Sequence, residues 1–271
     1  MAEAITSAAN PVVKRFRLLA DRRHRRREGA FVVEGIQPVW RAVEAGWEIE
    51  SLLVAPDLLA GSAALRMVAE QEARGVRVAR LTRELFLRLS EREGPPGLAA
   101  IVRSRTATLD RLTVTPGSVF AALHEVGNPG NLGTIIRTVD AVGGSGVILI
   151  GDATDPFAPA AVKASMGSLF AVDVAHVREP EEFFAWAAEH GVCVVTTSGR
   201  ATTEHWRAAY PQPAAVLLGS EGDGLPEELL SRGDLAVRIP MVGTAESLNL
   251  AVAAALVLYE VRRHQVGTEG Q

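Results

Sequence analysis

Residues 124–137 have the sequence His124-Glu-Val-Gly-Asn-Pro-Gly-Asn-Leu-Gly-Thr-Ile-Ile-Arg137, which predicts a strand end, a glycine-rich turn and a helix, in that order. The helix is predicted because apolar residues repeat at intervals of three and four and form one stripe, made by Leu132, Ile135, Ile136, Val139 and Val142. Arg137 lies on the opposite side of this helix, where it does not pack the core and can point at a ligand.

Outward from this stretch, the second half of the chain has nearly continuous apolar runs at residues 119–126, 146–150, 192–197, 214–218 and 235–239. Such runs are typical of parallel strands that are covered on both faces. Three segments rich in glycine and polar residues each follow one of these strands. Because ligands of open parallel sheets bind beyond the carboxyl ends of the strands, we expect a site there.

The second segment reads Leu217-Leu-Gly-Ser-Glu-Gly-Asp-Gly-Leu-Pro226, where glycines would let a flat ligand approach the backbone. Taken alone, it is better interpreted as an ordinary strand-to-helix turn.

The third segment reads Ile239-Pro-Met-Val-Gly-Thr-Ala-Glu-Ser-Leu-Asn249 and leads into a helix that is apolar on nearly every side through Tyr259. That helix is expected to be buried, Leu256 included, against the sheet or another subunit. If these residues had no functional role, Ser247 would be the N-cap of that helix, which leaves Asn249 unexplained.

The first half of the chain alternates short helices and strands. Helices are predicted at residues 11–20, 37–45, 63–74 and 82–89, and strands at 30–33, 49–55, 76–79 and 97–102. This alternation indicates a small α/β sandwich. Because the polar stretch before Pro116-Gly117 has the composition of a linker, we predict a domain at residues 1–105, a linker at 106–116 and a second domain at 117–271.

Charge is distributed unevenly between the two halves. Residues 1–105 contain 18 Lys and Arg against 13 Asp and Glu, whereas the remainder contains 10 against 19. Five of the six residues from Arg22 to Arg27 are basic, namely Arg22, Arg23, Arg25, Arg26 and Arg27. Such a cluster on an otherwise acidic protein favours a nucleic-acid partner, and its alternative is a solvated helix face.

Composition excludes several other classes of protein. No run of eighteen apolar residues is present, so a membrane span is not expected. The first residues lack the apolar stretch of a secretory signal, so a cytoplasmic protein is predicted. Cys193 is the one cysteine, which excludes an internal disulfide and a cysteine-rich metal site. We interpret it as a small buried apolar residue.

Two functions of other classes compete at this point. The glycine turn could bind a dinucleotide in an oxidoreductase, but Gly127, Gly130 and Gly133 are spaced G-x-x-G-x-x-G rather than G-x-G-x-x-G. A non-catalytic RNA-binding protein would use the basic first half alone. Neither hypothesis explains the Ser247-Leu-Asn249 sequence before the last helix.

Taken together, the three segments resemble the three motifs of the SpoU/TrmH RNA methyltransferases, over roughly residues 117–265. The matching residues are Asn128-Pro-Gly-Asn131 with Arg137, Gly219-Ser-Glu221-Gly-Asp-Gly224, and Ile239-Pro-Met with Ser247-Leu-Asn249. The first half resembles the L30e-like RNA-binding domain of many members, through Val32-Val-Glu-Gly35 and Gly97-Leu-Ala-Ala100. Among members, the arrangement is similar to ribosomal RNA methyltransferases, including those that confer resistance to thiostrepton or avilamycin.

The resemblance implies a C-terminal SPOUT domain, a parallel-sheet α/β domain with a deep trefoil knot, and a homodimer with the active site at its interface. Knots are nearly absent from proteins, so this topology depends on the resemblance alone. The implied reaction is 2′-O-methylation of a ribose in RNA, with 23S ribosomal RNA as the expected substrate and transfer RNA as the alternative. The methyl donor would be S-adenosylmethionine.

The resemblance also implies roles for individual residues. The implied catalytic residues are Arg137, Asn131, Glu221, Ser247 and Asn249. The cofactor would be held near Thr197, Ser198, Gly199, Leu218, Gly219, Ile239, Met241, Ser247 and Leu248. In the family the arginine is proposed to help deprotonate the hydroxyl. Because a guanidinium is a poor proton acceptor, we expect Arg137 to act electrostatically.

Overall fold

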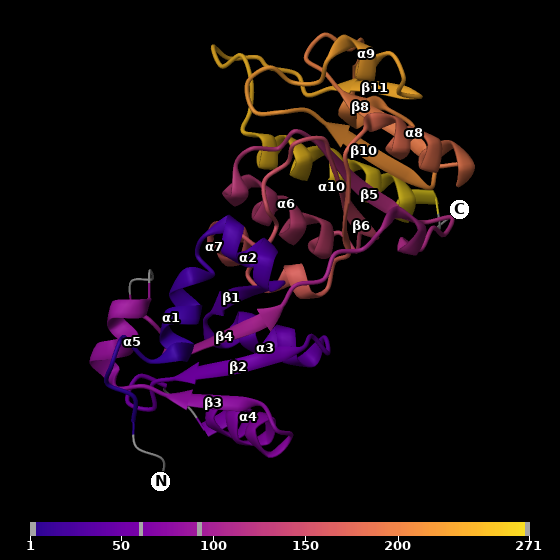
Figure 1. Ribbon diagram of the computed structural model, residues 1–271. Helices are drawn as coiled ribbons and strands as arrows, with labels where there is room; N and C mark the ends of the chain where they lie inside the picture. The colour runs from indigo at the N-terminus through magenta and orange to yellow at the C-terminus, as the bar shows by residue number, and fades with distance from the viewer. Residues whose placement is uncertain (1–3, 60–61, 91–93, 269–271) are drawn as a thin grey trace. The chain divides into compact units, whose positions relative to one another are not determined.

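The computed structural model describes residues 4–59, 62–90 and 94–268, and the chain divides into two compact units (Figure 1). The first unit comprises residues 1–105 together with 157–171, and the second comprises 106–156 and 172–271. The resemblance implied two α/β domains, and both units are α/β. Each unit has a sheet of its own.

The first unit is built on a mixed four-stranded sheet. Its strand order is β1 (Ala30–Glu34), β4 (Leu98–Arg103), β2 (Ile49–Val54) and β3 (Arg77–Arg80). Strand β4 runs antiparallel to both neighbours, and β2 pairs with β3 in parallel. The helices are α1 (Pro11–Leu18), α3 (Ile36–Glu44), α4 (Ser62–Ala73) and α5 (Arg83–Leu89). The α/β sandwich predicted for this half is confirmed.

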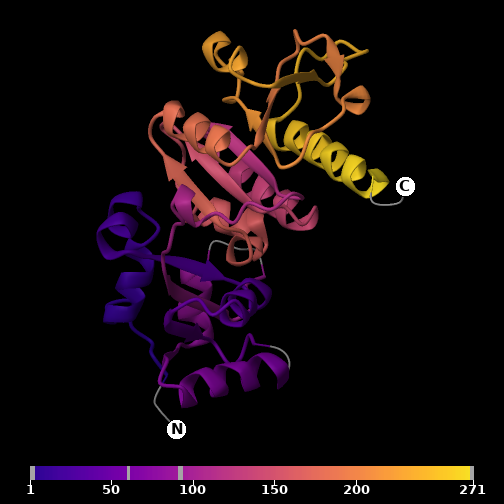
Figure 2. The same ribbon diagram turned by 90° about the vertical axis from the view of Figure 1, so that its right-hand side faces the viewer.

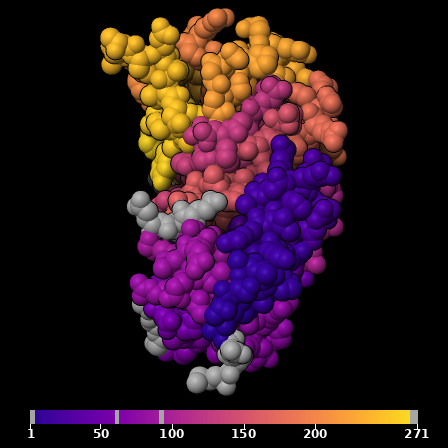
Figure 3. All heavy atoms as spheres, turned by 60° about the vertical axis from the view of Figure 1, so that its left-hand side comes forward, coloured from indigo at the N-terminus to yellow at the C-terminus, as the bar shows by residue number. Residues whose placement is uncertain are grey.

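The basic segment forms a further helix, α2 (Arg22–Glu28), which the apolar periodicity did not predict. It has no apolar stripe, and its ends are set by local hydrogen bonds instead. The side chain of Asp21 accepts hydrogen bonds from the backbone N–H groups of Arg23 and His24, and Gly29 ends the helix in the left-handed region. The earliest part of the chain, indigo in Figure 3, is exposed on the face shown there.

Residues 157–171 interrupt the second half of the sequence and belong to the first unit. They contain α7 (Pro159–Ser165), which contacts β1, and a short 3-10 helix at Ser168–Phe170. Aromatic packing explains the association. The Phe157 and Phe31 rings lie 4.7 Å apart, and the Trp47 indole N–H donates to the carbonyl of Phe170 at 3.2 Å.

The second unit contains a seven-stranded sheet whose paired strands are all parallel. The order is β7 (Val174–Val177), β6 (Gly146–Ile150), β5 (Val119–His124), β10 (Ala214–Leu218), β8 (Cys193–Thr197), β11 (Leu235–Arg238) and β9 (Thr203–Glu204). All five predicted strands are present. The short edge strands β7 and β9 were not predicted, because neither forms a continuous apolar run.

Helices cover both faces of this sheet (Figure 2). Helix α8 (Pro180–Glu189) places Phe183 and Trp186 on the face that carries Phe120 of β5 and Leu217 of β10. Helices α6 (Pro129–Ala141) and α10 (Leu250–Thr268) contact each other, and both contact β5. A single turn, α9 (Glu227–Leu230), follows the loop after β10. Cys193 in β8 is half-buried, and burial raises the pKa of its thiol to about 11.

Helix α10 is buried on one side only within the single chain. It begins at Leu250, and its buried side is made by Ala251, Ala254, Val257, Leu258 and Val261. Val252, Leu256 and Tyr259 remain 48%, 40% and 55% exposed. The sheet therefore does not bury Leu256, and its burial against another subunit stays a prediction.

None of the helices within the described residues is long and apolar enough to cross a membrane.

Candidate functional site

The three predicted site segments leave the same edge of the seven-stranded sheet. Strands β5, β10, β8 and β11 are neighbours and parallel, with Leu218 paired to Leu123 and Val237 paired to Thr197. Their carboxyl ends therefore point the same way. The loops that follow carry residues 125–128, 219–226, 198–202 and 239–249. This is the place at which ligands bind in open parallel sheets.

The first segment is fixed by the start of α6. Asn128 is the N-cap, and its Oδ1 accepts hydrogen bonds from the backbone N–H groups of Gly130 at 2.8 Å and Asn131 at 3.2 Å. Pro129 occupies the first helical position, where a missing N–H costs nothing. This cap places Asn131 in the first turn, beside the loop from β10.

Glu221 joins the second segment to the first. Its carboxylate accepts hydrogen bonds from the backbone N–H groups of Gly127 at 3.0 Å and Asn128 at 3.3 Å, and from the Asn131 side-chain amide at 3.0 Å. Partial burial alone raises the pKa of Glu221. The hydrogen bond from Asn131 and those from backbone N–H groups together outweigh that effect, so the pKa lies below its usual value.

Asn249 joins the third segment to the other two. Its Nδ2 donates to Oδ1 of Asn131 at 2.9 Å, while its Oδ1 accepts from the backbone N–H groups of Ala251 at 2.9 Å and Val252 at 3.4 Å. Asn249 is thus the N-cap of α10. The alternative in which Ser247 caps this helix does not hold, because α10 starts at Leu250.

The result is a continuous hydrogen-bonded path, which we call the Glu221–Asn131–Asn249 chain. Asn131 donates to the carboxylate and accepts from Asn249, so only one orientation of its amide satisfies both neighbours. Residues about ninety to one hundred and twenty positions apart in sequence are thereby held together before any ligand binds.

Arg137 lies further along α6 and is not part of this chain. Leu132, Ile135, Ile136 and Val139 are buried, as the apolar stripe predicted, whereas Arg137 is exposed. Its side chain makes no hydrogen bond or ion pair with any residue that the structure describes. Its guanidinium therefore remains available to a ligand or to another subunit.

The residues expected at a cofactor site lie in the loops at this same edge. Thr197 ends β8 and is followed by Ser198 and Gly199, and Leu218 ends β10 and is followed by Gly219. The Thr197 hydroxyl donates to the carbonyl of Leu217, and the Ser198 N–H donates to the carbonyl of Val237, so the loops are tied together. A side chain at Gly219 would approach within 2.1 Å of the Gly224 backbone, so the doubled-back loop needs glycine there.

The loop after β11 is open by comparison. It carries Ile239, Met241, Ser247 and Leu248, and every residue from 241 to 248 is exposed, with Val242 fully so. The backbone N–H and C=O groups of residues 241–248 make no hydrogen bond within the described chain. Unpaired backbone groups beside the apolar side chains of Met241 and Leu248 suit a ligand with a flat ring and a polar edge.

In the first unit, the five predicted RNA-binding arginines of α2 are not equivalent. Arg25 is 6% exposed and donates to the carbonyls of Leu19 at 3.1 Å and Ala20 at 2.6 Å. Its guanidinium therefore stabilises the connection between α1 and α2. Arg22, Arg23, Arg26 and Arg27 are exposed, and Arg27 also pairs with Glu28 at 2.9 Å.

Sequence reasoning assigned no role to Gly127 or Asn128, although Asn128 belongs to the first motif. Their backbone N–H groups hold the Glu221 carboxylate, and the side chain of Asn128 caps α6. The Asn128-Pro129 pair was a usable signal, since asparagine at the N-cap followed by proline is a common helix start. The contact with Glu221 had no local signal, because 93 positions separate Asn128 from Glu221.

Both halves of the chain match known protein families. Residues 118–259 match the model of the SpoU rRNA Methylase family, and residues 10–100 match the MRM3-like substrate binding domain. A 23S rRNA (uridine(2479)-2′-O)-methyltransferase from Streptomyces viridochromogenes is 35% identical, over 92% of this chain and 88% of that protein. A 23S rRNA (guanosine(2553)-2′-O)-methyltransferase from Bacillus subtilis is 31% identical, over 95% of this chain and 98% of that protein.

A solved structure has the same fold along almost the whole chain. It is that of an AdoMet-bound rRNA methyltransferase from Sinorhizobium meliloti, which is 37% identical. The TM-score is 0.88, and the match covers 97% of this chain and 98% of that one.

Proposed function

The chain belongs to the SpoU rRNA Methylase family, and we propose that this S-adenosylmethionine-dependent RNA ribose 2′-O-methyltransferase acts on 23S ribosomal RNA. The observation that carries the proposal is the Glu221–Asn131–Asn249 chain, which joins all three family motifs at one edge of the sheet. Two relatives that align with nearly the whole chain are 23S rRNA enzymes by name. The excess of basic residues in the first unit supports an RNA substrate.

We propose that the loops after β8, β10 and β11 hold the cofactor. The residues that would contact it are Thr197, Ser198, Gly199, Leu218, Gly219, Ile239, Met241, Ser247 and Leu248. The donor set fits, because the loop at residues 241–248 offers unpaired backbone groups together with exposed apolar side chains. Bound S-adenosylmethionine supplies a methyl group on a sulfonium, which is already a good leaving group. Alignment of the ribose 2′-oxygen with that methyl contributes on the order of 7–11 kcal/mol at best.

Arg137 would then act on the ribose as a fixed positive charge. Its guanidinium would stabilise the negative charge that develops on the 2′-oxygen as the hydroxyl proton passes to water, and it would bind the adjacent phosphate. Asn131 and Glu221 keep the first turn of α6 in place, and with it the helix that carries Arg137. Ser247 and Asn249 would position the ribose at the start of α10.

We propose that the enzyme is a homodimer formed through the uncovered side of α10. Val252, Leu256 and Tyr259 are spaced by four and three residues and form one exposed apolar face. Met241 and Val242 in the loop after β11 are exposed as well. A second copy would cover these side chains, which soluble monomers rarely leave open as a contiguous patch. The same contact would bring a partner surface to the open loop and to Arg137.

The substrate is tested by mapping 2′-O-methylated positions after incubation of the purified enzyme and S-adenosylmethionine with 23S rRNA and, separately, with bulk transfer RNA. We expect a single methylated ribose in 23S rRNA and none in transfer RNA. Methylation of transfer RNA alone would overturn the substrate in favour of a transfer RNA enzyme. Binding of both RNAs without transfer to either would contradict the catalytic assignment.

A further inference from the structure

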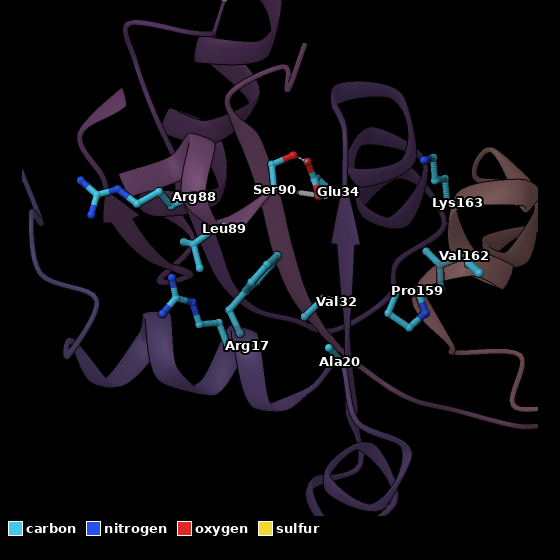
Figure 4. A pocket seen from close by; sticks show the side chains of 12 residues that line it. Arg17, Ala20, Val32, Glu34, Arg88, Leu89, Ser90, Pro159, Val162 and Lys163 are labelled. Atoms are coloured by element: carbon cyan, nitrogen blue, oxygen red, sulfur yellow. Dashed lines mark hydrogen bonds between the residues drawn. The ribbon is translucent and has the colours of Figure 1, made fainter. Parts of the chain in front are cut away.

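The first unit contains a cavity of about 430 Å³ that no known site of the chain explains. Its walls come from α1, β1, the end of α5 and α7, and its apolar lining includes Phe16, Val32, Leu89 and Val162 (Figure 4). A volume of this size falls within the range of about 300–1,000 Å³ that is usual for small-molecule sites. Charged side chains also line it, and a simple packing defect would be lined by apolar side chains alone.

A carboxylate and a hydroxyl lie inside this apolar lining. Glu34 is the last residue of β1, and Ser90 follows the last residue of α5. The Ser90 hydroxyl donates to Oε1 of Glu34, and both side chains are half-buried. This contact holds the carboxylate at the cavity. An ionised carboxylate is a hydrogen-bond acceptor, so it favours N–H donors and repels small anions.

Three cationic side chains surround this pair. Arg17, Arg88 and Lys163 line the cavity and are exposed. In Figure 4, Arg17 and Arg88 lie on one side of the Glu34–Ser90 contact and Lys163 lies on the other. None of the three makes a hydrogen bond or ion pair with another residue in the described part of the chain. The rim therefore attracts an anionic ligand, while the interior accepts a neutral group that carries N–H donors.

A nucleotide of single-stranded RNA has this combination of properties. Its base has apolar faces and an edge with N–H donors, and its phosphates are anionic. An apolar peptide would make no use of the three cationic side chains. Inorganic phosphate alone would leave the apolar lining unfilled and would be repelled by the Glu34 carboxylate. Guanine fits the carboxylate best, because its ring N–H and its amino group are adjacent donors.

We propose that this cavity holds one unstacked nucleotide of the substrate RNA, guanosine preferentially, with its base against the apolar lining and its flanking phosphates on Arg17, Arg88 and Lys163. The proposal extends the proposed function, since it presumes that RNA is the substrate. It assigns to the first unit a specific contact with a base, in addition to charge attraction by α2.

The test uses fluorescence anisotropy of the full-length protein with two labelled RNA decamers, oligouridylate and the same strand with one central guanosine. The wild-type protein is expected to prefer the guanosine strand. Ala20→Phe places a ring in the cavity from one wall and Ala160→Phe from another, without removing a charge. Each is expected to weaken binding about tenfold or more, the effect expected for one stacked base. Glu34→Gln is expected to abolish the preference for guanosine.

Ala69→Phe is the matched control, because Ala69 is exposed on α4 and does not line the cavity. Its affinity should stay within about twofold of wild type, as expected for a surface substitution. Arg17→Gln and Lys163→Gln should each reduce the slope of log affinity against log salt by about 0.7, the value for one phosphate of a single strand. Unchanged affinity in both cavity-filling variants, with native thermal stability, would overturn the proposal.

Methylation assays separate this proposal from the function on which it rests. If Ala20→Phe methylates 23S rRNA with an unchanged KM, the cavity proposal is wrong and the proposed function stands. If wild-type protein methylates no 23S rRNA but the decamer results hold, the substrate assignment is wrong and the nucleotide site stands.

Discussion

Two loops at the same edge of the seven-stranded sheet differ in how many of their backbone groups are hydrogen-bonded. The loop after β5 is closed by two kinds of hydrogen bond. The Glu221 carboxylate accepts from the backbone N–H of Asn128, and the Asn128 side-chain oxygen accepts from the backbone N–H of Gly130. The loop after β11 is exposed from residue 241 to residue 248, and the backbone groups of these residues make no hydrogen bond with the residues that the structure describes. Asn249 marks the boundary, because it both joins the first loop and caps α10.

One part of the candidate site is therefore ordered by hydrogen bonds within the chain, whereas another part has no such partners. The Glu221–Asn131–Asn249 chain fixes the start of α6, and therefore the helix from which Arg137 projects. The loop after β11 and the apolar face of α10 lack partners within the described part of the chain. We infer that the cofactor and a second subunit complete them.

The largest effect is expected from replacing Arg137. Arg137→Ala should fold, dimerise and bind cofactor, because the buried side of α6 is unchanged, yet reduce methyl transfer by at least roughly 10²–10³. Arg137→Lys should recover little, since an ammonium does not reproduce the bidentate guanidinium. Single-turnover methylation measures the effect, with Arg111→Ala as the control, an exposed arginine before β5. Near-wild-type transfer by Arg137→Ala would make it an ordinary surface residue.

The open face of α10 gives the next largest effect. Leu256→Glu should weaken dimerisation by about thirtyfold, or roughly 2 kcal/mol, because a carboxylate would lie in an apolar interface. The monomer itself should keep most of its stability, since Leu256 is 40% exposed in the single chain. Light scattering against concentration measures this, with Leu65→Glu on α4 as the control at a leucine that is 44% exposed. A monomeric wild-type enzyme with full activity would contradict the shared site.

The loop after β5, which Glu221 holds in place, gives a smaller effect that depends on pH. Glu221→Gln should destabilise the second unit by about 1 kcal/mol at neutral pH, because an amide cannot accept from both backbone N–H groups as a carboxylate does. The pKa of Glu221 is lowered in the folded protein, so its contribution is present above the ordinary value of 4.5 and disappears as the pH falls through the folded value.

Denaturation of wild type and Glu221→Gln at several pH values measures that contribution. The two curves should converge in acid, where the wild-type carboxyl is protonated and resembles the amide. Asp223→Asn removes another carboxylate from the same loop and should show no such convergence. A difference between wild type and Glu221→Gln that does not change with pH would exclude a charged Glu221 as the organising acceptor.

The smallest effect concerns α2, in which Arg25 is bonded within the chain and the other arginines are exposed. Replacing Arg22, Arg23, Arg26 and Arg27 by Gln should reduce the salt slope of RNA binding by about 0.9 for each phosphate that the variant no longer neutralises. Arg25→Gln should instead lower thermal stability, because Arg25 bonds to the carbonyls of Leu19 and Ala20. Filter binding and thermal melts distinguish the two. A salt slope that the fourfold variant leaves unchanged would reduce α2 to a solvated surface.

Much of this architecture was predictable from local patterns. The continuous apolar runs predicted β5, β6, β8, β10 and β11, and the stripe on α6 correctly placed Arg137 on its exposed side. The polar residues at strand ends indicated the edge of the sheet at which the three segments meet. These features depend on periodicities of a few residues, which a sequence shows directly.

Other features depend on long-range contacts and were not predictable. The buried role of Arg25 needs the carbonyls that end α1, and the half-exposed state of Leu256 depends on which side of α10 meets the sheet. Likewise, the placement of residues 157–171 in the first unit follows from aromatic packing with Phe31 and Trp47. No local pattern of residues encodes these partners.

Hydrogen–deuterium exchange tests the contrast between the two loops most directly. In the Leu256→Glu monomer without cofactor, amides of residues 241–248 should exchange at nearly unprotected rates, while those of Gly127, Gly130 and Asn131 should be protected. Addition of S-adenosylmethionine to the wild-type dimer should slow exchange at residues 241–248 and change the other loop little. Protection of residues 241–248 in the cofactor-free monomer, or no change on cofactor binding, would contradict the account.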